Sequence, residues 1–232
     1  MPDDRIVRIL NQVRAFYAAG KKSSNKVYAK ANFVSDADWD QHSRRWSVRM
    51  MGGNLLHNRN KNRVISGLHR PDGPDAGQSY HDWASGLWNG GAAAEFTSGN
   101  CMEMASVAAM LATSPDYRFH RPWTRLARIR APGDHVFCIL SRPVPSWATA
   151  DAMRPGPTDQ DRSLAYVIDP WMNIACAAEE YWALVEQKLK KWSLEGKRIW
   201  WNGTRGDRAG WYYPLGEYAW ALGSGPIQYL AI

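Results

Sequence analysis

Apolar side chains recur at helical spacing near the start of the chain, over residues 4 to 18. They are Ile6, Ile9, Leu10, Val13, Phe16 and Tyr17, and the positions between them carry mostly arginine, asparagine and glutamine. This periodicity predicts an amphipathic helix, and Gly20 predicts its end. From residue 21 to residue 77 the periodicity fades, apart from a weak helical pattern over residues 36 to 49, and turn-forming residues predominate. We therefore expect a loosely ordered segment there.

A second helix is expected to begin at or next to Cys101. Ser98, Gly99 and Asn100 supply turn and N-cap residues, and the run that follows, CMEMASVAAMLA, contains no helix breaker before Ser114 and the proline after it. Alanines are frequent in this run. Small side chains allow a helix to pack closely on a sheet, so we expect that arrangement here.

The rest of the chain alternates strand, loop and helix patterns. Residues 124 to 130 predict a partly exposed strand, residues 135 to 140 an apolar strand, and residues 164 to 169 a third strand. A stretch with four prolines, residues 142 to 163, forms a long excursion between two of these strands and is expected to be a mobile flap over the site. Residues 178 to 192 predict an amphipathic helix, and the tail from 197 to 232 predicts short strands. The fold class is α+β.

Composition supports an ordinary globular protein. The chain has 232 residues, of which 45% are hydrophobic and 22% charged, which excludes wholesale disorder and fibrous repeats. No apolar run reaches the length of a membrane span, and the amino terminus lacks the features of a Sec signal peptide. Tryptophan is in excess, and we expect a Trp-rich core that includes Trp171, Trp182, Trp192, Trp200, Trp201, Trp211 and Trp220.

Positive charge is concentrated in the amino-terminal third. Residues 1 to 70 hold fourteen Lys and Arg against five Asp and Glu, a net +9, whereas the whole chain has +7. We expect a basic helical amino-terminal arm, residues 1–77, followed by a catalytic domain, residues 78–232. The arm is either a solvated face or a surface for an anionic membrane or an acidic protein. The chain contains no nucleic-acid-binding signature, so nucleic acid is not an expected partner.

Three residues form a candidate catalytic group. Cys101 lies at a predicted helix start, where unpaired N–H groups and the helix dipole favour the nucleophilic thiolate. His135 opens the strand after a Gly-Asp turn and could serve as general base and acid, and Asp169 closes the next strand and could orient the imidazole. The other cysteines, Cys138 and Cys176, lie among apolar residues and are expected to be core thiols. Cysteine spacing suggests neither a disulfide framework nor a metal site, and no cofactor is expected.

Three motifs in order carry a resemblance to a known family. They are GNCMEMASVAAMLA around Cys101, GDHVFCIL around His135, and YVIDPWMN around Asp169, followed by a helix with EEYW and a Gly-Lys turn. Together they resemble the papain-like cysteine-fold effectors and toxins of bacteria, which include glutamine deamidases of the Pasteurella-toxin type and related effector cysteine proteases. The resemblance covers about residues 95 to 205. It implies a papain-like fold with a central antiparallel sheet and the nucleophile at a helix amino terminus.

The same resemblance implies the roles and the setting of the protein. Cys101 would be the nucleophile, His135 the general base and acid, and Asp169 its orienting partner. The protein would be secreted or injected by a bacterium without a Sec signal peptide and would act on a protein in the cytoplasm of a target cell. Papain-type proteases place an oxyanion-hole glutamine about six residues before the cysteine, where this chain has Glu95. Candidates for oxyanion or substrate binding are therefore Asn100, Trp171 and Asn173.

Several functions remain open from the sequence. Deamidation of a Gln or Asn side chain of a protein is the first expectation, followed by proteolysis, transglutamination and peptidoglycan amidase chemistry, all of which can use an acyl-enzyme on the same cysteine. A different class of function is a non-catalytic adaptor that binds an anionic partner through residues 1 to 70.

Overall fold

A computed structural model describes residues 3–18, 27–29, 77–92, 101–142, 145–153, 165–201 and 210–232. The weak helical pattern over residues 36 to 49, and all of the irregular segment before residue 77 except residues 27–29, lie outside these ranges. Among the described residues, no helix is both long enough and apolar enough to cross a membrane.

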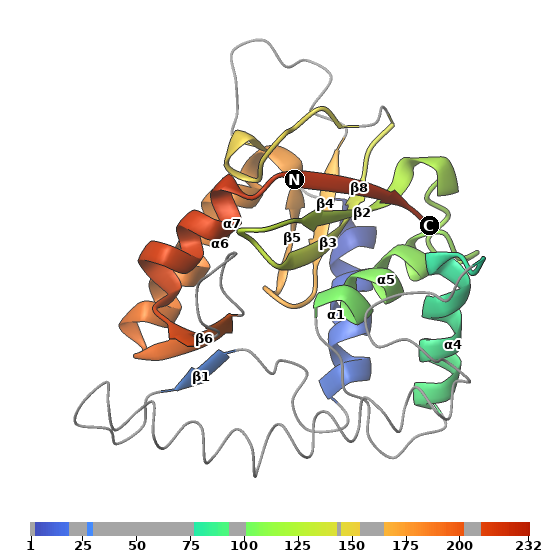
Figure 1. Ribbon diagram of the computed structural model, residues 1–232. Helices are drawn as coiled ribbons and strands as arrows, with labels where there is room; N and C mark the ends of the chain where they lie inside the picture. Colours follow the sequence, from blue (N-terminus) through green and yellow to red (C-terminus); the bar gives the residue numbers. More distant parts are fainter. Residues whose placement is uncertain are drawn as a thin grey trace.

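The centre of the fold is a five-stranded antiparallel sheet (Figure 1). Its strands are β2 (Thr124–Ile129), β3 (His135–Leu140), β4 (Tyr166–Asp169), β5 (Ile174–Ala177) and β8 (Ile227–Ala231), in the spatial order β5-β4-β3-β2-β8. Every residue of β3 is buried, which is why its sequence is an uninterrupted apolar run after His135 rather than an alternating one. The antiparallel sheet and the mixed α/β class agree with the α+β expectation.

Helices pack around this sheet in two groups. They are α1 (Asp4–Ala18), α4 (Tyr80–Ala92), α5 (Cys101–Ala112), α6 (Ala178–Leu194) and α7 (Ala219–Ser224). Figure 1 shows α1, α4 and α5 together on the right of the sheet and α6 and α7 on its left. Helix α5 is buried at all twelve positions and packs on β3, so its alanines permit the close approach that the sequence predicted. Its first residue is Cys101, as expected.

The first helix belongs to the main core. Its bounds match the predicted range, and Ile6, Ile9 and Val13 are fully buried against α5, β4 and β5. Phe16 also stacks on Trp88 of α4, with ring centroids 4.4 Å apart. The expectation that this helix forms part of a separate basic arm is not confirmed for residues 4 to 18, because their apolar stripe is covered by α5, β4 and β5.

The carboxyl-terminal tail is only partly made of strands. Strands β6 (Lys197–Trp201) and β7 (Gly210–Tyr212) form a second antiparallel sheet with β1 (Val27–Ala29), but a kinked turn over Pro214–Tyr218 leads into helix α7 instead of another strand. Trp220 on α7 is 60% exposed, which corrects its assignment to the core. Trp171, Trp182 and Trp192 are buried as predicted.

The proline-rich excursion begins and ends at the end of the sheet opposite the candidate site. Leu140 at the end of β3 pairs with Tyr166 at the start of β4, so the connection between them leaves from the end opposite His135 and Asp169. Its described part is also packed: Trp147, Ala150 and Met153 are buried, and Ile227 donates a backbone hydrogen bond to Ala148. The expected flap is therefore wrong for residues 145–153. Residues 154–164 lie outside the described ranges.

Candidate functional site

Three elements bring Cys101, His135 and Asp169 to the same end of the sheet. Because β3 and β4 are antiparallel, the first residue of β3 and the last residue of β4 lie at one end, and α5 begins there as well. All three side chains are buried, with 5% of Cys101, 1% of His135 and none of Asp169 exposed. The sequence separates these residues widely, so the antiparallel pairing is what assembles them.

Asp169 is held by three donors. Its Oδ2 atom lies 2.7 Å from His135 Nε2 and accepts a hydrogen bond from the Tyr181 hydroxyl at 2.9 Å. Its Oδ1 atom accepts a hydrogen bond from the Met172 backbone N–H at 3.0 Å. A fully buried carboxylate is costly unless it is hydrogen-bonded, and this network orients the carboxylate as well as satisfying it.

The imidazole of His135 interacts with both neighbours. Burial by itself disfavours the imidazolium, but the charge and hydrogen bond of Asp169, together with an interaction with the Cys101 side chain, outweigh burial and raise the pKa of His135 well above its ordinary value. Since Nε2 faces Asp169, Nδ1 is the nitrogen left to face the thiol. The Cys101 Sγ atom also lies 3.8 Å from the backbone oxygen of Asp134. This arrangement can stabilise a thiolate–imidazolium pair.

Two tyrosines of the site were missed from the sequence. In the sequence, Tyr181 belongs to the apolar positions of the helix predicted over residues 178 to 192. In the structure its hydroxyl donates a hydrogen bond to Asp169. Tyr218 is fully buried, and its hydroxyl lies 3.4 Å from Oδ1 of Asp134, the residue whose carbonyl faces Cys101. Burial and nearby negative charge raise the pKa of both phenols. A buried tyrosine hydroxyl usually has a hydrogen-bond partner. A tyrosine within an apolar stripe was therefore the sequence signal for a buried polar contact.

The residues proposed for oxyanion or substrate binding have different positions. Trp171 is buried beside His135, with ring centroids 5.2 Å apart, and meets Trp192 edge-on. It forms a wall of the site, and its role in substrate binding stays a prediction. Asn173 is exposed and has a φ of 60° in the turn between β4 and β5, a conformation that asparagine tolerates better than most residues. Asn100 and Glu95 lie outside the described residues.

The three cysteines differ in environment, which predicts an order of thiol reactivity. Burial raises the pKa of the Cys138 and Cys176 thiols far above the ordinary value, whereas Cys101 has an imidazole beside it. We expect iodoacetamide at neutral pH to alkylate Cys101 first in the native protein. Peptide mapping by mass spectrometry of samples quenched at increasing times measures the order. Faster labelling of Cys138 or Cys176 would contradict the assignment of Cys101 as nucleophile.

Tyr181 is predicted to tune the acid–base behaviour of His135. Its hydroxyl and the imidazole both contact Oδ2 of Asp169. The change Tyr181→Phe removes one hydrogen-bond donor from that oxygen, which then stabilises the protonated His135 ring more strongly. We expect the His135 titration, followed by NMR of the ring, to move to higher pH. Tyr229→Phe is the matched control, because the Tyr229 hydroxyl donates to the backbone oxygen of Trp147 and Tyr229 lies on β8, three strands from β4 in the sheet. An unmoved titration in Tyr181→Phe would contradict the prediction.

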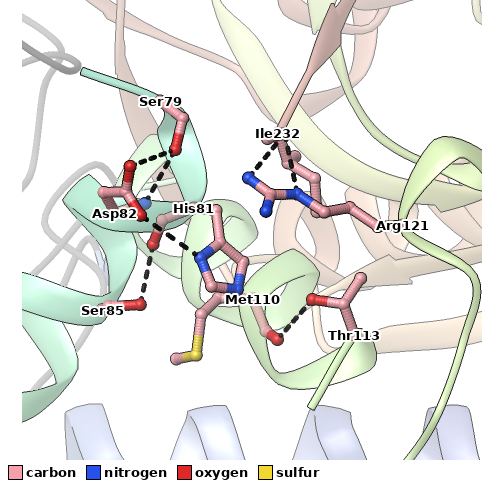
Figure 2. Close-up of polar contacts among 8 residues, drawn as sticks. All are labelled: Ser79, His81, Asp82, Ser85, Met110, Thr113, Arg121 and Ile232. Atoms are coloured by element: carbon pink, nitrogen blue, oxygen red, sulfur yellow. Dashed lines mark hydrogen bonds and ion pairs between the residues drawn. The ribbon is translucent and has the colours of Figure 1, made fainter.

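A second grouping of serine, histidine and aspartate lies at the start of α4, where Figure 2 shows its polar contacts. Ser79 Oγ donates to Asp82 Oδ2 at 2.8 Å and accepts a hydrogen bond from the Asp82 backbone N–H at 3.1 Å. His81 Nδ1 lies 3.7 Å from Asp82, which is largely exposed. These contacts form a helix cap, because the serine is bonded to the carboxylate and the histidine is not placed between them as a catalytic base.

Over the described ranges, no three potential metal-ligating side chains of the His, Cys, Asp or Glu type gather in one place. Comparison of the chain with protein-family models, with curated proteins and with solved structures finds no significant match in any of the three.

Proposed function

We propose that this protein is a cysteine-dependent hydrolase with a papain-like catalytic arrangement, and that it deamidates a Gln or Asn side chain of a protein. The observation that carries the proposal is the contact of one buried imidazole with both Asp169 and Cys101: His135 Nε2 lies 2.7 Å from Asp169, and the Cys101 side chain interacts with the same ring. Nucleophile, base and orienting group thereby follow the order of a catalytic triad.

The chemistry follows from these positions. The Cys101 thiolate attacks the carboxamide carbon, and the carbonyl electrons move to oxygen. The Cys101 backbone N–H, at the first position of α5, lacks an intrahelical partner and can donate to that oxyanion. The His135 imidazolium then protonates the departing nitrogen, so that ammonia leaves and a thioester remains. Water attacks the thioester as His135 takes its proton, and breaking the C–S bond releases the carboxylic acid, which gives its proton to solvent, and restores the thiolate–imidazolium pair.

Burial of the reacting groups favours a side-chain amide over an extended peptide as substrate. Only 5% of Cys101 and 1% of His135 are exposed, which suits a narrow entrance for one carboxamide better than an open cleft along a backbone. The insertion between β3 and β4 does not bear on this preference, because its described part leaves from the other end of the sheet. Secretion by a bacterium and action inside a target cell are proposals supported by the motif resemblance alone.

Mass spectrometry of intact candidate proteins, incubated with wild-type enzyme or with the Cys101→Ala variant, tests the proposal. The expected result is conversion of one specific Gln or Asn to the acid, with the target chain left intact, only in the wild-type sample. Cys101-dependent chain cleavage without an acidic product would replace deamidation with proteolysis, and a new amide link to an added amine would indicate transglutamination. Absence of any Cys101-dependent product across folded proteins and peptidoglycan would favour an adaptor.

A further inference from the structure

Strand β8 forms one edge of the five-stranded sheet. It pairs with β2 on one side only, and Figure 1 shows it as the outermost strand. Natural edge strands are commonly protected from further pairing by charged residues, proline or a bulge. The sequence of β8, IQYLA, contains no charged residue and no proline, and its pairing with β2 is uninterrupted. The strand therefore carries none of the features that discourage the addition of another strand.

Alternation along the strand determines which backbone groups face outward. Arg130 donates its backbone N–H to the oxygen of Pro226, so that oxygen lies on the β2 side. In an antiparallel pair, successive residues direct their N–H and C=O groups alternately toward and away from the partner strand. The residues of β8 that direct theirs away from β2 are Ile227, Tyr229 and Ala231.

The beginning of this outer edge is covered and the rest is open. Ile227 donates its backbone N–H to Ala148 at 2.8 Å, so the loop after β3 lies beside the first residue of β8. Farther along, no residue in the described part of the chain hydrogen-bonds to the outward N–H and C=O groups of Tyr229 and Ala231. We call residues 229–231 the docking edge. Its outward groups can pair with an extended segment of another chain.

Three arginines surround the docking edge. Arg125 and Arg128 lie on β2 directly beside β8 in the paired register, and their side chains are on opposite faces of the sheet because an odd number of positions separates them. Beyond the end of β8, Arg121 donates from Nε and Nη2 to the backbone oxygen of Ile232 at 3.3 Å (Figure 2). Positive charge therefore borders the edge on both faces and at its end.

Carboxylates of the described ranges do not neutralise these arginines, because every ion pair found there involves other residues. Asp82, which Figure 2 draws together with Arg121, instead accepts a hydrogen bond from Ser79. At the covered end of β8, Thr149 donates to Asp151. An anionic partner would therefore complement the charge around the docking edge.

We propose that the docking edge binds an extended acidic segment of a partner protein, which adds to β8 as a further strand of the sheet. Backbone hydrogen bonds to Tyr229 and Ala231 hold the segment, and its Asp or Glu side chains meet the three arginines. Charge argues against a second copy of this chain as the occupant. Pairing of β8 with β8 would bring both sets of arginines together, and β8 has no acidic residue to offset them.

The docking edge is separate from the triad. His135 pairs with Ile129 at one end of the sheet, and Ile129 pairs with Ile227 at the beginning of β8. The docking edge follows toward the other end of that strand. A bound segment therefore leaves Cys101 accessible, and the inference goes beyond the proposed function without depending on it.

A short fluorescent peptide of alternating glutamate and valine tests the proposal on the full chain. The control peptide has lysine in place of every glutamate. Fluorescence anisotropy at low ionic strength should show binding of the acidic peptide only, with an affinity that falls as salt is added. Amide exchange followed by NMR should be fast at Tyr229 and Ala231 in the free chain and slower with the peptide. Leu230, whose N–H faces β2, is the slow internal reference.

Matched variants separate backbone pairing from charge. Ala231→Pro removes an outward N–H without touching the bonds to β2, and should weaken binding of the acidic peptide by about fivefold or more. Ala231→Ser keeps that N–H and should bind like the wild type. Arg128→Gln should weaken binding by about threefold at low ionic strength, whereas Lys190→Gln removes a charge from an exposed position of α6 and should have no effect. Circular dichroism establishes that each variant is folded.

Each contrary outcome overturns the proposal in a recognisable way. Equal binding of the two peptides, or no binding of either, removes the acidic partner, and so does an unchanged affinity in folded Arg128→Gln if Ala231→Pro does not fold. A dimer in sedimentation that Ala231→Pro dissociates would assign the edge to a second copy. Slow exchange at Tyr229 and Ala231 in the free monomer would show that another segment of this chain fills the edge. Alkylation of Cys101 by iodoacetamide should proceed equally with and without the peptide, so these failures leave the proposed function intact.

Discussion

Replacing Cys101 or His135 with alanine is expected to lower the rate of amide hydrolysis by at least about a thousandfold, because triad members act as one unit. Asp169→Asn is expected to retain more activity than either, since it leaves the imidazole present but misoriented. Without the carboxylate, burial then dominates and lowers the pKa of His135. Initial rates of substrate conversion by mass spectrometry, with NMR titration of the His135 ring, measure both effects.

Cys176→Ala is the matched control for the thiol. Cys176 is buried on β5 and lies outside the Cys101–His135 contact. Its removal should change stability modestly and leave the rate close to that of the wild type. If Cys101→Ala remained as active as Cys176→Ala, the triad and the hydrolase proposal would both have to be abandoned.

The second large effect concerns the first helix. Ile9 is fully buried where α1 packs on α5 and the sheet, so Ile9→Ala should lower the free energy of unfolding by about 2–5 kcal/mol. Asn11→Ala is the control, because Asn11 is exposed on the same helix and exposed substitutions change stability by about 0.5 kcal/mol or less. Urea unfolding followed by circular dichroism gives both values.

Removing residues 1–18 should leave the chain unable to fold. The deletion uncovers apolar surface of α5, β4 and β5 in addition to losing the buried side chains of α1, and the summed loss is comparable to the typical total stability of about 5–15 kcal/mol. A truncated protein that unfolds cooperatively and keeps a reactive Cys101 would contradict this and restore the idea of a separable arm.

Local patterns were enough to predict most of the elements. Helical periodicity gave the bounds of α1, and the change from turn residues to an Ala- and Met-rich run located the start of α5 at Cys101. The apolar run from His135 to Leu140 predicted β3. Helix α4 and strand β5 were not predicted, because α4 contains three glycines, and β5 is only four residues long.

The tail and the excursion show where local patterns failed. Trp220 looked like a core residue but is exposed on α7, because residue type alone does not tell which side of a short helix faces the protein. The excursion of residues 142 to 163 was expected over the site because it lies between His135 and Asp169 in sequence. In an antiparallel pair, however, the connection leaves from the end of the first strand, and His135 is at its beginning.

The sequence by itself determined which chemistry-bearing residues begin or end an element, because propensities, turns and periodicity act over a few neighbouring positions. Only the tertiary structure decided which side chains come into contact at the site. Strand pairing brought His135 to Asp169, and α6 supplied the Tyr181 hydroxyl. These contacts join residues 34 and 12 positions apart, and they depend on how buried faces pack against one another, which no short stretch of sequence specifies.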